Sequence, residues 1–88
     1  MDTLVARIQR LKWRTDALLS ENLPESSRFL LTEEAGPHIE AAFASCMKRG
    51  AAAEYHWAYA DSYISFVEDG QKQLATMIEE LERLCPGD

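Results

Sequence analysis

The stretch that decides the fold is residues 51–85, which read AAAEYHWAYADSYISFVEDGQKQLATMIEELERLC. They contain no proline and one glycine, Gly70, and their apolar side chains recur every three or four residues. Side chains at these intervals share one face of an α-helix. We therefore expect one long helix over about 51–85, with a core stripe along its length. The stripe consists of Tyr55, Tyr59, Ser62, Phe66, Gly70, Leu74, Met77, Leu81 and Leu84.

This helix is too long for one small chain to cover. At a rise of about 1.5 Å per residue it would span roughly 50 Å. A compact chain of 88 residues has a radius of gyration of only about 12 Å. We therefore expect the stripe to contact a second copy of the chain or a partner protein. A turn at Glu68, Asp69 and Gly70 could split the helix, but the stripe stays in phase across Gly70, which favours a continuous helix.

Two shorter helices are expected before it. The second should cover about 37–49, because Pro37 suits a first helical turn and Gly50 suits the residue after a helix end. Residues 21–36 are predicted to be a connector, in which Pro24 could start a short helical turn that contains the apolar residues 29–31. The first helix should cover about 3–20, where apolar residues step by four and three to form a narrow seam. The seam consists of Leu4, Ile8, Leu11, Thr15 and Leu18.

These elements predict the fold class. The chain is expected to form a single all-α domain over residues 1–88, a small three-helix bundle. The second and third helices should form an antiparallel hairpin because only one or two residues separate them. A domain of this size buries a modest share of its surface, so dimerisation would supplement its stability. We expect a homodimer.

The charge distribution excludes some classes of partner. The net charge is −6, made up of +2 over residues 1–20 and −8 over residues 21–88. An acidic domain repels a phosphate backbone, so we expect no nucleic-acid partner. No stretch approaches the roughly 18 apolar residues of a membrane span, and none resembles a signal peptide. We therefore expect no membrane partner and a cytoplasmic location with both cysteines reduced.

Residues with catalytic or metal-binding chemistry are few. A zinc site uses ligands in close pairs, but the cysteines, Cys46 and Cys85, lie 39 residues apart and the histidines, His38 and His56, lie 18 apart. We interpret the histidines as unrelated and Cys46 as a buried side chain of the second helix. No phosphate loop or nucleophile–base motif is present in the sequence. The predictions are no enzyme activity, no metal and no cofactor.

Large apolar residues away from the stripes are candidates for a protein interface. Trp57 and Ile64 lie beside the stripe of the third helix, and Trp13 lies opposite the seam of the first. Tryptophan is favoured at interfaces because it buries a large area with little loss of freedom. Packing inside the bundle is an equally good explanation, since the first helix could bury Trp57. The predicted protein-interface residues are Trp13, Trp57 and Ile64, with Asp61 and Glu68 as a charged rim.

Two short stretches, Leu23–Ser26 and Gly36–Ala42, resemble the connector and the start of the second helix in TraM-type quorum-sensing antiactivators. Those are small helical bacterial proteins that bind LuxR-type transcription factors. The similarity covers less than a fifth of the chain, and no functional residue is carried over from it. It adds an antiactivator to the options.

The leading functional hypothesis is a non-enzymatic, protein-binding regulator that covers a partner's surface. An antiactivator, an immunity protein, an antitoxin or a chaperone would each fit. The alternative is a structural homodimer or assembly subunit with no external client. A small enzyme or metal protein is the third hypothesis.

Overall fold

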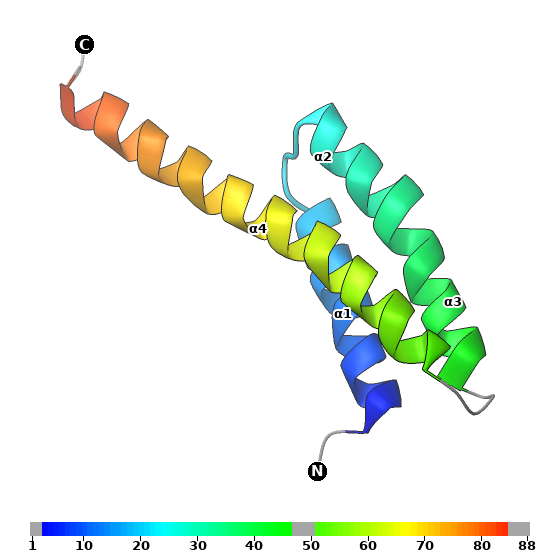
Figure 1. The fold of residues 1–88 in the computed structure, drawn as a ribbon. Helices are drawn as coiled ribbons and strands as arrows, with labels where there is room; N and C mark the ends of the chain where they lie inside the picture. The colour runs from blue at the N-terminus through cyan, green and yellow to red at the C-terminus, as the bar shows by residue number, and fades with distance from the viewer. Residues whose placement is uncertain (1–2, 47–50, 85–88) are drawn as a thin grey trace.

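The computed structural model describes residues 3–46 and 51–84, and over these residues the chain is all-α with no strand. The helices are α1 (Leu4–Leu19), α2 (Glu25–Phe29), the π-helical segment η1 (Leu30–Ala35), α3 (Gly36–Cys46) and α4 (Ala52–Leu84). Because α2, η1 and α3 follow one another without a break, they act as the middle helix of a three-helix bundle (Figure 1). The predicted fold class is confirmed. Gly50 and Cys85 lie outside the described residues.

The first helix forms as its sequence predicts. Thr3 is the N-cap, and its hydroxyl accepts a hydrogen bond from the Ala6 N–H at 3.1 Å, which satisfies one of the free amides of the first turn. The side-chain hydroxyl of Thr15 donates to the Leu11 carbonyl at 2.9 Å, so this polar group is satisfied inside the core. The buried seam of α1 consists of Ile8, Leu11, Thr15 and Leu18.

The predicted connector over 21–36 is wrong for most of its length. Residues 25–35 are helical, and Pro37 lies inside a continuous helix rather than in its first turn. A proline ring clashes with the carbonyl four residues earlier and supplies no N–H. The chain accommodates Pro37 through the wider π turn of η1, where the Gly36 N–H donates to the Leu31 carbonyl five residues back.

The core lies where the first half of α4 packs against α1, η1 and α3. The α3 and α4 helices run antiparallel, and α1 lies beside both (Figure 1). Aliphatic side chains from every long helix meet there. Those with the largest volume and almost no exposure are Ile8, Leu11, Leu31, Ile64 and Val67.

The second half of α4 projects away from the bundle (Figure 1). The helix is continuous through Gly70 to Leu84, and every residue over 72–84 is exposed. The molecule measures 59 × 28 × 18 Å, with a radius of gyration of 16.2 Å, against about 12 Å for a compact chain of this length. None of the helices in the described part of the chain is long and apolar enough to cross a membrane.

Candidate protein-binding surface

The apolar stripe of α4 lies outside the bundle. Phe66 is 69% exposed, Leu81 is 60% exposed and Tyr59 is 44% exposed. The stripe is therefore not packed into a core within one chain, and its contact with a second copy or a partner protein stays a prediction. We call the exposed set the α4 stripe. It consists of Tyr55, Tyr59, Phe66, Leu74, Met77, Ile78, Leu81 and Leu84.

The bundle contacts a neighbouring face of α4 instead. Small side chains at Ala53 and Ala60 let the helix approach α1 and α3 closely, and Ile64 and Val67 fill the space between the helices. These four positions are also spaced for one helix face, at intervals of seven, four and three. The sequence thus carried two apolar faces on α4, and the less bulky one became the core.

Two of the five predicted interface residues pack against the core of the bundle. Ile64 is completely buried, and Trp57 is partly buried and packs against the core. These two predicted anchors are therefore corrected: a side chain that fills the bundle is not available to a partner. Trp13 is 62% exposed on α1 and remains on the surface.

Trp57 contributes to the contact between α4 and α1. The guanidinium carbon of Arg7 lies 4.3 Å from the centre of its ring, which is cation–π geometry. The same arginine contacts Glu54 at 3.5 Å. The indole N–H of Trp57 is buried and has no hydrogen-bond partner among the residues that the structure describes.

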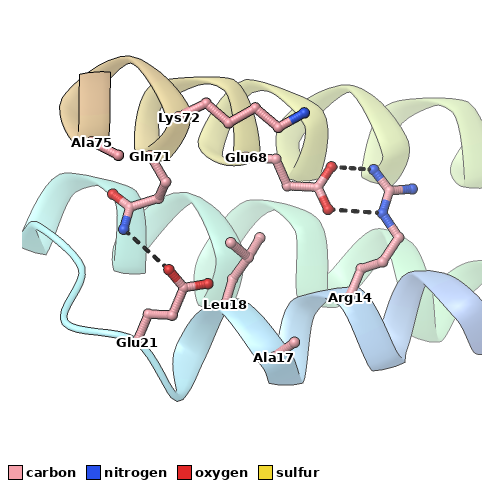
Figure 2. Close-up of a pocket in the computed structure, with 8 residues that line it drawn as sticks. All are labelled: Arg14, Ala17, Leu18, Glu21, Glu68, Gln71, Lys72 and Ala75. Atoms are coloured by element: carbon pink, nitrogen blue, oxygen red, sulfur yellow. Dashed lines mark hydrogen bonds and ion pairs between the residues drawn. The ribbon is translucent and has the colours of Figure 1, made fainter. Parts of the chain in front are cut away.

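Asp61 and Glu68, predicted as a charged rim, instead bind Arg14 of α1. Glu68 accepts two hydrogen bonds from the guanidinium, at 2.7 and 3.1 Å (Figure 2), and Asp61 accepts a third at 2.8 Å. The Ser65 hydroxyl lies 3.2 Å from the same group. Such paired, charge-assisted bonds fix orientation as well as distance. Arg14 therefore links α1 to two carboxylates of α4.

The charges in this cluster shift one another's titration. The hydrogen bonds from Arg14 hold the pKa of Glu68 below its usual range, and the same bonds raise the pKa of Arg14. Both members of the Arg14–Glu68 pair are therefore charged at neutral pH.

Elsewhere on α4, the neighbouring Tyr59 raises the pKa of the exposed Tyr55 phenol.

A pH dependence of stability follows from Glu68. Because its pKa is lower in the folded chain, its contribution is present above the unfolded-state pKa of about 4.3 and is lost as the pH falls through the folded value. We expect Glu68→Gln to reduce the drop in the free energy of unfolding between about pH 7 and pH 3, measured by urea titration. Glu80→Gln, on the projecting part of α4, is the control and should leave the drop unchanged. An identical drop in the wild type and Glu68→Gln would contradict the assignment.

A groove of about 500 Å³ lies where α4 leaves the end of α1. The Arg14–Glu68 pair closes one end, and Gln71 donates to Glu21 at 3.4 Å at the other (Figure 2). Leu18 and the two alanines, Ala17 and Ala75, supply its apolar lining. The groove is shallow and open, so it suits a partner's side chain better than an enclosed small molecule.

The two histidines are in contact, so the interpretation that they are unrelated is wrong. The Nδ1 atoms of His38 and His56 are 2.9 Å apart, a hydrogen bond between α3 and α4. The His38 ring also stacks on Tyr59 with a centroid distance of 5.1 Å. His38 lies eight residues before the end of α3 at Cys46, whereas His56 lies four residues after the start of α4 at Ala52. Distance from the connection therefore gave no signal for this contact, which arises from the packing of α3 against α4.

The chemistry of the described residues is limited. Over 3–46 and 51–84, no three histidine, cysteine or acidic side chains gather in a way that could hold a metal ion. Cys46 is partly buried, and its thiol lies 3.1 Å from the Phe43 carbonyl.

No protein-family model matches the chain, and searches of curated proteins and of solved structures also give no significant match. The α4 stripe is the strongest candidate for a functional surface because it exposes eight large apolar side chains along one helix.

Proposed function

We propose that this protein is a non-enzymatic, cytoplasmic regulator that binds another protein through the α4 stripe. The observation that carries the proposal is the exposure of eight large apolar side chains along one helix. Contiguous exposed apolar surface of this kind marks protein interaction sites. The regulator would act stoichiometrically, by covering a surface that its partner needs for its own activity, as an antiactivator, immunity protein, antitoxin or chaperone does.

The residues of the projecting half of α4 indicate what kind of partner surface would bind it. Leu74, Met77 and Leu81 are spaced to lie in a groove or against another helix. Acidic residues border this part of the stripe, Glu80 on one side and Glu82 on the other. Basic side chains beside an apolar groove would complement them and speed association. A bacterial transcription factor with such a surface is one partner of this type.

The test uses a photo-crosslinking amino acid at Met77, with Glu79 as the matched control. Both positions are exposed on the projecting half of α4, but two residues along a helix place them on opposite faces. We expect one foreign protein to crosslink in native cells from Met77 and not from Glu79. The identified protein, once purified, should bind in a fixed ratio and lose binding to Met77→Glu. Equal labelling from both positions, or none from Met77, would contradict the proposal.

A structural homodimer with no external client is the second candidate. It uses the same α4 stripe and differs only in what covers it. The spacing of apolar residues on either side of Gly70 favours self-pairing.

A further inference from the structure

Gly70 is unexplained within a single chain. It lies in the middle of a 33-residue helix, where glycine is less favourable than alanine. Its backbone is exposed, and a Cβ added there would meet no atom within 4 Å. Neither a turn nor a close neighbour in the bundle therefore requires glycine at this position. Gly70 lies on the same face of α4 as the α4 stripe, because it falls four residues from both Phe66 and Leu74.

Two pairs of residues in the α4 stripe lie symmetrically about Gly70. Phe66 and Leu74 lie four residues before and after it, and Tyr59 and Leu81 lie eleven residues before and after it. The half-buried Tyr63 and the exposed Met77 are each seven residues away. Intervals of four, seven and eleven all return to the same face of a helix. The stripe is therefore aromatic toward the bundle and aliphatic toward the projecting end.

Two copies of such a helix are complementary when they run antiparallel. With a twofold axis through Gly70, Phe66 of one copy faces Leu74 of the other, and Tyr59 faces Leu81. Each aromatic ring meets an aliphatic side chain, so large and branched side chains alternate across the contact. The missing side chain of Gly70 lets the two backbones approach at the crossing point, where helix axes lie about 8 Å apart.

The exposed area is of the size that a dimer requires. The chain exposes 6329 Å², whereas a compact monomer of 10.0 kDa exposes about 5,200 Å². The excess is about 1,100 Å², and a stable interface covers about 800 Å² on each partner. A second chain lying along α4 could cover this excess.

The charges beside the α4 stripe also favour the antiparallel arrangement. In a parallel pair Glu80 and Glu82 of the two copies would lie at the same level, and like charges would repel. In the antiparallel pair Glu80 lies at the level of the partner copy's Ala60, and Asp69 lies at the level of the partner copy's Gln71. Glu80 and Glu82, the acidic residues that border the stripe, are then level with alanines of the partner copy and not with its acidic residues.

We propose that a second copy of this chain covers the α4 stripe, antiparallel and with its twofold axis at Gly70. The inference rests on the proposed function in one respect, that the α4 stripe is a protein-binding surface. The free protein is then a dimer with a covered stripe, and a foreign partner that uses the same surface displaces one copy.

Sedimentation of the full chain tests the dimer, with Gly70→Gln as the decisive variant. Glutamine is a better helix former than glycine and meets open space in the protomer, so the variant should fold at least as well as the wild type by circular dichroism. We expect wild-type particles of twice the 10.0 kDa chain mass, and a dissociation constant raised about tenfold or more by Gly70→Gln. Thr76→Gln, away from the stripe, should have no effect. A wild-type monomer, or a dimer insensitive to Gly70→Gln, would overturn the proposal.

Disulfide trapping tests the orientation, in a chain carrying Cys46→Ala and Cys85→Ser. A cysteine at Gly70 should crosslink the two copies, because the Cα atoms at a close crossing lie within the roughly 4.4–6.8 Å that a disulfide spans. A cysteine at Leu81 should not crosslink with its own copy. Crosslinking from both positions means a parallel pair and overturns the proposal. If the chain is a monomer but Met77 still crosslinks to a foreign protein, the dimer proposal is wrong and the regulator proposal stands. If the chain is a dimer and Met77 crosslinks to no foreign protein, the regulator proposal is wrong and the dimer proposal stands.

Discussion

Replacing Ile64 by alanine is expected to lower the free energy of unfolding by about 3 kcal/mol. The side chain is completely buried between α4 and the other helices. Its loss removes apolar burial and leaves a cavity that tightly packed neighbours fill only in part. Since a small domain has only about 5–10 kcal/mol of stability, the variant should unfold at much lower urea. Urea titration followed by far-ultraviolet circular dichroism measures the change.

Phe66→Ala is the matched control for this substitution. Phe66 lies two residues further along α4 and is 69% exposed, so its removal should cost the protomer less than about 1 kcal/mol. Both variants are compared at a protein concentration low enough to keep the chains apart. If Phe66→Ala destabilised the chain as much as Ile64→Ala, the assignment of Ile64 to the buried face of α4 and Phe66 to the exposed face would be wrong.

Replacing Arg14 by methionine is expected to cost about 2 kcal/mol of stability. Three hydrogen bonds of 2.7 to 3.1 Å to Asp61 and Glu68 are lost, and two partly buried carboxylates are left close together without a cation. Methionine keeps the length and apolar character of the arginine stem, so packing changes little. Chemical denaturation at neutral pH measures the loss.

Glu54→Gln is the control for Arg14→Met. It removes the looser ion pair with Arg7, in which the carboxylate side chain is 64% exposed, so its effect should stay below about 1 kcal/mol. Adding Glu68→Gln to Arg14→Met should restore part of the lost stability, because one of the two repelling charges is removed. An Arg14→Met variant as stable as the wild type would show that this cluster does not hold α1 and α4 together.

Local periodicity was enough to predict the helices but not which face of α4 is buried. The seam of α1 is single, so Ile8 and Leu11 could be assigned to the core from spacing alone. In α4 two apolar faces lie side by side, one bulky and one that includes Ala60 and Ile64. The choice between them depends on how closely the neighbouring helices approach, which is a property of the whole bundle.

Two further features arise from tertiary structure. The π turn around Pro37 keeps the middle helix continuous, whereas rules for isolated helices place a boundary there. The contact between His38 and His56 depends on the pairing of α3 with α4, so residue spacing within one helix does not reveal it. The Arg14 cluster likewise joins residues 47 and 54 positions apart.

The bundle provides the nucleus from which the exposed end of α4 extends as a helix. An isolated peptide of the 13 residues over 72–84 would be mostly unstructured in water, because starting a helix is far less favourable than extending one. In this chain the bundle already holds the first turns of α4, so the exposed turns only extend an existing helix. The result is a preformed arm of about 20 Å that loses little entropy when a companion chain settles on it.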